Sequence, residues 1–139
     1  MRGLTLLALG VLLIAACHGD GGGSPTEPSN PLTGSWGGTY SGRNHTTGAP
    51  LSGTLSMSLV QGGPLVTGNG TQCDSFGCTS GTINGSVSGN GIVFTAAPSD
   101  PRLCPYRATG TWSNSLIHAD WVSFSCSASL SGSLDVTKQ

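Results

Sequence analysis

The stretch LSGTLSMSL, from Leu51 to Leu59, decides the fold class, because its apolar and hydroxyl side chains alternate with a period of two residues. Successive side chains of a β-strand point to opposite faces of the sheet. Leu51, Leu55, Met57 and Leu59 would therefore share one face, and the serines and threonine between them would share the other. This pattern predicts a strand with one buried face and one solvated face.

The same alternation continues in both directions along the chain. In a first strand, Gly34, Trp36, Gly38 and Tyr40 would share one face. No stretch after Cys17 carries a convincing helical pattern. After the Leu51 strand, further strands are expected over residues 65–71, 79–88, 92–94, 106–112, 116–122 and 128–137.

Turn-forming residues separate these strands. The alternation is broken at three segments, Gln61–Pro64, the proline-rich Pro98–Pro105 and Ser113–Ser115. Asn90-Gly91 is the strongest hairpin signal, because both central residues of a type I′ turn need a positive φ. The last connection contains no such residues at its centre, and we place it in Ser123–Ser129.

Eight short antiparallel strands would leave two exposed sheet edges unless the sheet closes on itself. We therefore predict an all-β fold, an eight-stranded antiparallel up-and-down barrel. A two-sheet β-sandwich is the alternative. The consecutive hairpin spacing favours the barrel, because Greek-key sandwiches need long crossover connections.

Loop length predicts two different barrel ends. In an up-and-down meander, alternate connections lie at the same end. The four longer connections, residues 42–50, 72–78, 97–105 and 123–129, would then form one rim. The tight turns and both termini of the domain would lie at the other end.

Four cysteines fall on this predicted rim, and an even number of cysteines indicates disulfides when a protein is exported, as the N-terminal segment described below predicts. We expect Cys73 to pair with Cys78, and Cys104 with Cys126. In the chain-entropy account these bonds contribute about 2 and about 3 kcal/mol, the longer loop more. Zinc binding by the four thiolates is the alternative, but the paired CxxC spacing that zinc sites favour is absent.

Composition excludes some classes of partner and activity. Charged residues are 8% of the 139 residues and the net charge is −1, so no basic patch is available for nucleic acid. His118 and Asp120 lie two apart on the polar face of one strand, and no motif supplies a nucleophile. We therefore expect a protein that is not an enzyme and has no catalytic residues, no metal site and no cofactor. We also expect a single domain and a monomer.

The segment LTLLALGVLLIAAC, Leu4–Cys17, follows a single basic residue and has the layout of an export signal. Its apolar run would make roughly 20 Å of helix, too short for a hydrocarbon core of ~30 Å. Ile14-Ala15-Ala16-Cys17 resembles the lipobox of bacterial lipoproteins. The resemblance implies that residues 1–16 are a signal peptide and that Cys17 is lipidated.

The residues after Cys17 are rich in Gly and Pro and carry no apolar periodicity, so residues 17–31 would form a flexible linker before a β-barrel domain at 32–139. The lipid would attach this domain to a membrane of the bacterial cell envelope. His18 in place of Asp after the cysteine resembles lipoproteins sent to the outer membrane. The tight-turn end would then face the membrane, since the linker enters there.

Leu32-Thr33-Gly34-Ser35-Trp36 resembles the first-strand G-x-W of the calycins, the lipocalin and avidin barrels. The resemblance implies that Trp36 plugs one end of the barrel and that a basic residue near the last strand, here Lys138, lies against it. The long loop and C-terminal helix of lipocalins are missing. A plain core aromatic is the other interpretation of Trp36.

Two functional hypotheses follow. The first is a binding module for a small apolar or mixed ligand, with Trp36, Tyr40, Arg43, Phe76 and Arg102 as candidate contacts in the interior and on the rim loops. The second is a structural or protein-interaction lipoprotein with a filled barrel that meets another envelope protein. An internal cavity above about 300 Å³ that opens between the long loops favours the first hypothesis.

Overall fold

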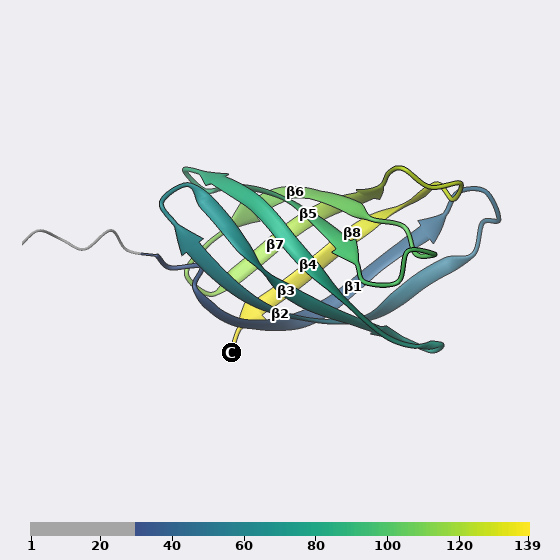
Figure 1. Cartoon of the computed structure of the whole chain (residues 1–139), viewed down its shortest axis with the longest axis horizontal. Coiled ribbons are helices and arrows are strands. Elements are labelled where there is room, and N and C mark those ends of the chain that lie inside the picture. Colours follow the sequence, from purple (N-terminus) through teal and green to yellow (C-terminus); the bar gives the residue numbers. More distant parts are fainter. Residues whose placement is uncertain (1–29) are drawn as a thin grey trace, which may run out of the picture.

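The computed structural model describes residues 30–139, which form a closed barrel of eight antiparallel strands in sequential order (Figure 1). Each strand pairs with the next, and β8 closes the barrel by pairing with β1. The predicted up-and-down barrel is confirmed, and the β-sandwich is wrong. The strands are β1 (Gly34–Asn44), β2 (Pro50–Gly62), β3 (Leu65–Asp74), β4 (Gly77–Ser88), β5 (Gly91–Pro98), β6 (Tyr106–Trp112), β7 (Leu116–Ser123) and β8 (Leu130–Lys138).

The two ends of the barrel differ as loop length predicted. The turns after β2, β4 and β6 lie at the end where the chain enters at Asn30 and where it leaves at Gln139 (Figure 1). The connections after β1, β3, β5 and β7 lie at the opposite end, which we call the rim. The predicted signal peptide (residues 1–16), Cys17 and nearly all of the predicted linker lie outside the described residues.

One predicted rim loop is in fact a tight hairpin. We expected a long loop over residues 72–78, but β3 continues to Asp74 and β4 begins at Gly77. Cys73 and Cys78 are direct register partners, so their disulfide joins two paired strands instead of clipping a loop. The Asp74 carboxylate accepts a hydrogen bond from the Phe76 amide (2.7 Å), which stabilises this short turn.

The hairpin between β4 and β5 is present, but its turn type differs from the prediction. Ser88 pairs with Gly91, so Gly89 and Asn90 are the central residues. Only Gly89 has a positive φ, at 55°, as a type II′ turn requires at its first central position. Asn90-Gly91 was predicted as the turn because both residues tolerate a positive φ, but Gly91 is the first residue of β5 and pairs with Ser88.

The alternation of the strands fills the interior. Inward-facing residues of all eight strands form one apolar cluster, including Met57 and Leu59 of β2, Ile92 of β5 and Ile117 of β7. The side chains between them face outward and are mostly Ser, Thr and charged residues. Among residues 30–139 there is no helix of the length and apolar character needed to span a membrane.

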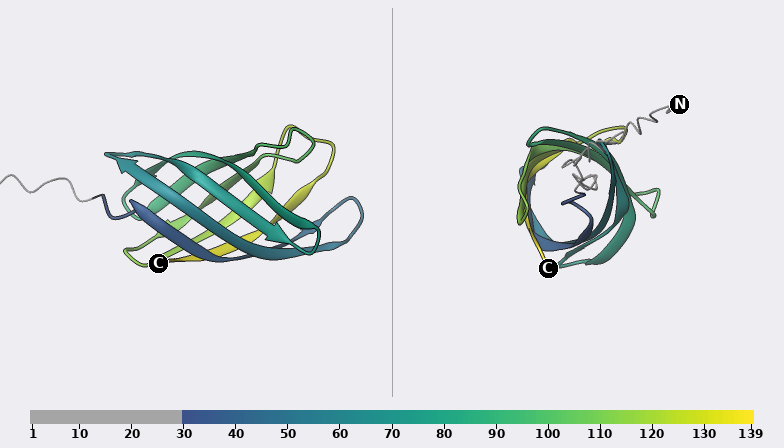
Figure 2. Two further views of the ribbon diagram at one scale, coloured as in Figure 1. Left: turned by 60° about the horizontal axis from the view of Figure 1, so that its bottom comes forward. Right: turned by 90° about the vertical axis from the view of Figure 1, so that its left-hand side faces the viewer.

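A polar and aromatic plug closes the end of the barrel opposite the rim. Leu32 is fully buried, and the end-on view in Figure 2 shows residues 30–33, directly before β1, within the outline of the ring of strands. The Trp36 indole N–H donates to the Leu32 carbonyl (2.9 Å), and the Leu32 amide donates to the Gln61 side chain (3.2 Å). These bonds satisfy polar groups that would otherwise be buried without partners.

Lys138 lies where the G-x-W resemblance implied. It is the register partner of Trp36 across β1 and β8, so both side chains point to the same side of the wall. The ammonium nitrogen is 5.6 Å from the centre of the indole ring and donates to the Pro31 carbonyl (2.5 Å). A cation at this distance from an aromatic face is stabilising.

Candidate functional site

A cavity of about 350 Å³ occupies the rim half of the barrel. Its lining is mostly apolar and comes from all eight strands, from the β3–β4 hairpin and from the β5–β6 loop. Because the lining includes exposed rim residues, the cavity opens at the end opposite the plug. The lining residues are Tyr40, Leu51, Leu55, Gln72, Asp74, Phe76, Gly77, Cys78, Thr79, Pro98, Leu103, Cys104, Tyr106, Trp121, Ser123, Leu130 and Leu134.

Three aromatic rings form one wall of the cavity. Trp121 lies between Tyr40, at 6.4 Å between ring centres and nearly perpendicular, and Tyr106, at 5.9 Å and tilted. The indole N–H of Trp121 donates to the Ser133 carbonyl (3.2 Å), which holds the ring in place without a ligand. Edge-to-face packing of this kind is favourable, so the wall is preorganised.

Glycines opposite these rings leave the room that the rings occupy. A Cβ at Gly42 would lie 2.6 Å from the Trp121 ring, and a Cβ at Gly53 would lie 2.7 Å from the Tyr40 ring. An even nearer neighbour at each position is a backbone carbonyl oxygen, that of Ser131 at Gly42 and that of Cys73 at Gly53. These glycines therefore allow the strands to approach closely and also leave room for the rings.

Both tyrosines of the wall keep their protons at neutral pH. Burial, with a smaller contribution from Tyr40, raises the pKa of Tyr106 to about 12. Burial also raises the pKa of Tyr40, the Asp74 charge adds to this effect, and the Gln72 side chain opposes it. The two hydroxyls are therefore neutral groups that can both donate and accept hydrogen bonds.

Among the described residues that line the cavity, one is charged, Asp74, whose carboxylate lies at the mouth. Asp74 and Gln72 belong to the series of β3 residues that begins with Val66 and points inward. Thr79 and Ser123 add hydroxyl groups. The cavity is thus apolar in its depth, aromatic on one wall and acidic at its edge.

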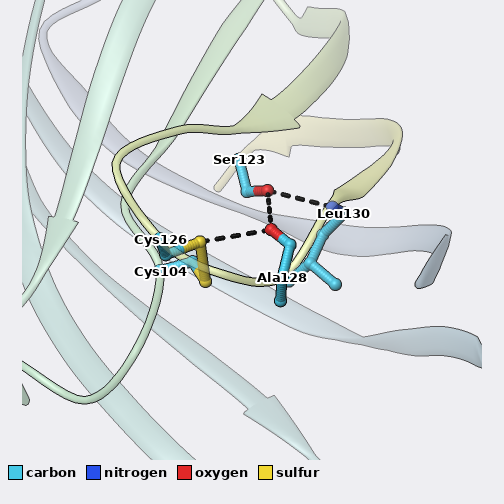
Figure 3. The surroundings of a disulfide bond; sticks show 5 residues. All are labelled: Cys104, Ser123, Cys126, Ala128 and Leu130. Atoms are coloured by element: carbon cyan, nitrogen blue, oxygen red, sulfur yellow. Dashed lines mark hydrogen bonds between the residues drawn. A yellow bond between two sulfur atoms is a disulfide. The ribbon is translucent and has the colours of Figure 1, made fainter. Parts of the chain in front are cut away.

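The Cys104–Cys126 disulfide ties two rim loops together beside the cavity (Figure 3). Ser123 reinforces the second loop, since its hydroxyl donates to the Ala128 carbonyl and accepts from the Leu130 amide, each at 2.9 Å. The Cys126 sulfur lies 3.2 Å from the same carbonyl, as a contact without a proton because the sulfur is in a disulfide. The structure thus pairs the four rim cysteines as predicted, which excludes the four-thiolate zinc site.

Two of the five residues proposed as ligand contacts line the cavity, Tyr40 in the wall and Phe76 at the mouth, where its side chain is 97% exposed. The other three lie elsewhere. Trp36 is in the plug, and Arg43 is on the outward face of β1.

Arg102 makes a bidentate ion pair with Asp100 (2.7 Å) on the exposed β5–β6 loop. This pairing, chiefly its hydrogen bonds, holds the pKa of Asp100 at about 2. Since its guanidinium is engaged outside the cavity, Arg102 is not positioned to contact a ligand inside.

Sequence reasoning missed the strongest members of the site, Tyr106 and Trp121, and also Gln72 and Asp74. Their inward alternation was visible, since Trp121 shares a face with Ile117 and Ala119. The alternation did not indicate their depth in the barrel. Gln72 and Asp74 were missed because their segment was interpreted as a loop.

His118 and Asp120, which lie two residues apart on β7, do not form a hydrogen-bonded pair. His118 instead binds Asp135, its register partner on β8, with 2.6 Å between the ring nitrogen and the carboxylate. Hydrogen bonding to Asp135 raises the pKa of His118, and both side chains are exposed on the outer wall. Cross-strand partners lie closer than residues two apart on one strand, which explains the change of partner. Within residues 30–139, no three His, Cys, Asp or Glu side chains gather as metal ligands.

Comparisons with known proteins add little to this geometry. No protein-family profile and no curated protein matches the chain. Among solved structures, the chain is similar to that titled "Crystal Structure of Rv2717c from M. tuberculosis", with 16% sequence identity and a TM-score of 0.48. The alignment covers 78% of this chain and 93% of that one.

Proposed function

We propose that this protein is a lipid-anchored binding module of the cell envelope that holds a small, mostly apolar molecule in the rim half of its barrel. The cavity carries this proposal. Its volume of about 350 Å³ falls within the range of small-molecule sites, and its lining combines many apolar groups with a few polar ones. A filled interior, which the structural hypothesis requires, has no place for such a cavity.

The rigidity of the cavity and the residue types that line it also support a binding role rather than a catalytic one. The wall is held by its own ring contacts and by the Trp121 hydrogen bond, and the rim loops are held by the Cys104–Cys126 disulfide. A site that is already formed loses little conformational entropy when a ligand binds. Among the lining residues, no nucleophile lies beside a histidine base.

Leu51→Trp should weaken the binding of a neutral apolar dye such as Nile red. Leu51 lines the cavity near its mouth, and an indole there would occupy space that the dye needs. Ser52→Trp is the matched control, because Ser52 is exposed on the outward face of the same strand. Fluorescence titration measures both variants, and we expect at least a tenfold weaker affinity for Leu51→Trp alone. Absence of dye binding to the unmodified protein would refute the binding role.

We further propose that the anchor is a lipid on Cys17, since the lipobox resemblance lies there. Expression of the full chain in a bacterium should give a membrane-bound protein whose mass exceeds that of residues 17–139 by acyl chains. Cys17→Ser should remove both the added mass and the membrane association. An unmodified, freely soluble protein in the unsubstituted form would contradict the anchor.

A further inference from the structure

The aromatic wall and the acidic edge of the cavity together select the charge of its ligand. The electron-rich rings of Tyr40, Trp121 and Tyr106 line a space whose walls are mostly apolar. The face of an aromatic ring carries negative electrostatic potential, which attracts organic cations and repels anions. This step rests on the proposed function, since it assigns a ligand class to the same cavity.

The formal charge at the cavity is negative, like the electrostatic potential at the faces of the aromatic rings. Asp74 is the one charged lining residue, and its carboxylate reaches the wall electrostatically, since it contributes to the raised pKa of Tyr40. Within residues 30–139, no basic side chain lines the cavity. Arg43 and Arg107 are exposed on the outer wall, Arg102 is paired with Asp100, and Lys138 is in the plug at the far end.

An anionic ligand would therefore lack a partner. Moving a carboxylate or sulfate into this cavity would cost its hydration and offer no cation in return, with the Asp74 charge beside it. An ammonium group would instead meet a wall of three aromatic side chains and one carboxylate. The leucines Leu51, Leu55, Leu130 and Leu134 supply apolar surface for the rest of the molecule.

We propose that the cavity binds amphipathic organic cations, molecules with an alkyl or aryl body and an amine or quaternary ammonium group. The ammonium group lies against the Tyr40, Trp121 and Tyr106 rings, on the side of Asp74. The apolar body packs against the leucines. The neutral tyrosine hydroxyls and the Gln72 side chain accept hydrogen bonds from a protonated amine.

The test compares three probes with the same tail: octyltrimethylammonium, octanol and octanoate. Isothermal titration calorimetry on the purified protein, below the aggregation concentration of each probe, should give an affinity about tenfold higher for the ammonium than for octanol. Octanoate should bind more weakly than octanol. Equal affinity for octanol and the ammonium would overturn the charge preference while leaving the binding function standing. No binding of any probe would overturn both.

Three variants separate the contributions of Asp74 and of the aromatic wall. Asp74→Asn keeps an oxygen that can accept from the Phe76 amide, and it should weaken ammonium binding about threefold without changing octanol binding. Tyr106→Leu removes an aromatic face, whereas Tyr106→Phe keeps it. The ammonium preference over octanol should fall about threefold in Tyr106→Leu and remain in Tyr106→Phe. Equal losses of the two probes in Asp74→Asn and in Tyr106→Leu would contradict the assignment.

Discussion

Replacing Trp36 with alanine is expected to lower the free energy of unfolding by about 3–5 kcal/mol. The side chain is only 1% exposed and fills the end of the barrel, where it also binds the Leu32 carbonyl and carries Lys138 on its ring. The variant leaves a large cavity, leaves the Leu32 carbonyl without its donor and removes the ring beneath Lys138, and these effects destabilise the folded protein. Urea unfolding followed by far-ultraviolet circular dichroism measures the loss.

Trp112→Ala is the matched control for this substitution. Trp112 belongs to the same end of the barrel and its indole N–H also donates to a backbone carbonyl, that of Gly89 (3.1 Å), but the side chain is only partly buried. We expect a clearly smaller loss, because less apolar surface leaves water in the folded state. Equal losses of unfolding free energy in the two variants would contradict a greater contribution of Trp36 to stability. Ligand binding should survive in Trp36→Ala, since the cavity lies at the rim.

Replacing both Cys104 and Cys126 with serine is expected to lower the free energy of unfolding by about 3 kcal/mol. This disulfide closes the longer loop, with a sequence separation of 22 against 5 for Cys73 and Cys78. In the chain-entropy account the longer loop restricts the unfolded chain more. Equilibrium urea unfolding of the double variant, at the same pH and salt as the unsubstituted protein, gives the difference.

The double substitution of Cys73 and Cys78 by serine is the control, with an expected loss of about 2 kcal/mol. These cysteines are register partners, and the paired strands β3 and β4 keep them close without the bond. A larger loss for this pair than for Cys104 and Cys126 would contradict the ordering by loop length. Reduction of the unsubstituted protein should reproduce the sum of the two losses when the bonds act independently.

Much of the fold could be predicted because a barrel repeats one local rule. Alternation along residues 51–59 and 130–136 assigned each side chain to the inner or outer wall without any tertiary information. The prediction of the tight hairpins was wrong at two places. At Gly89, Asn90 and Gly91, overlapping turn signals compete, and between Cys73 and Cys78 a segment interpreted as a disulfide-clipped loop is a pair of strands.

The candidate site was less predictable than the fold. Trp36 and Tyr40 are two inward aromatics of the same strand with the same alternation, yet Trp36 lies in the plug and Tyr40 in the cavity wall. Their four-residue separation corresponds to roughly 13 Å along a strand, which is enough to pass from the plug to the cavity. Periodicity does not report on position along the barrel axis.

The sequence by itself determined the all-β class, the inner and outer faces, the two unlike ends and the pairing of the rim cysteines, because each depends on neighbouring residues or on their order along the chain. Only the tertiary structure decided that one half of the barrel is packed and the other hollow. An empty volume is the difference between the space that eight strands enclose and the side chains that enter it. That difference depends on register and strand tilt across the whole wall, which bring Tyr40, Tyr106 and Trp121 to one level.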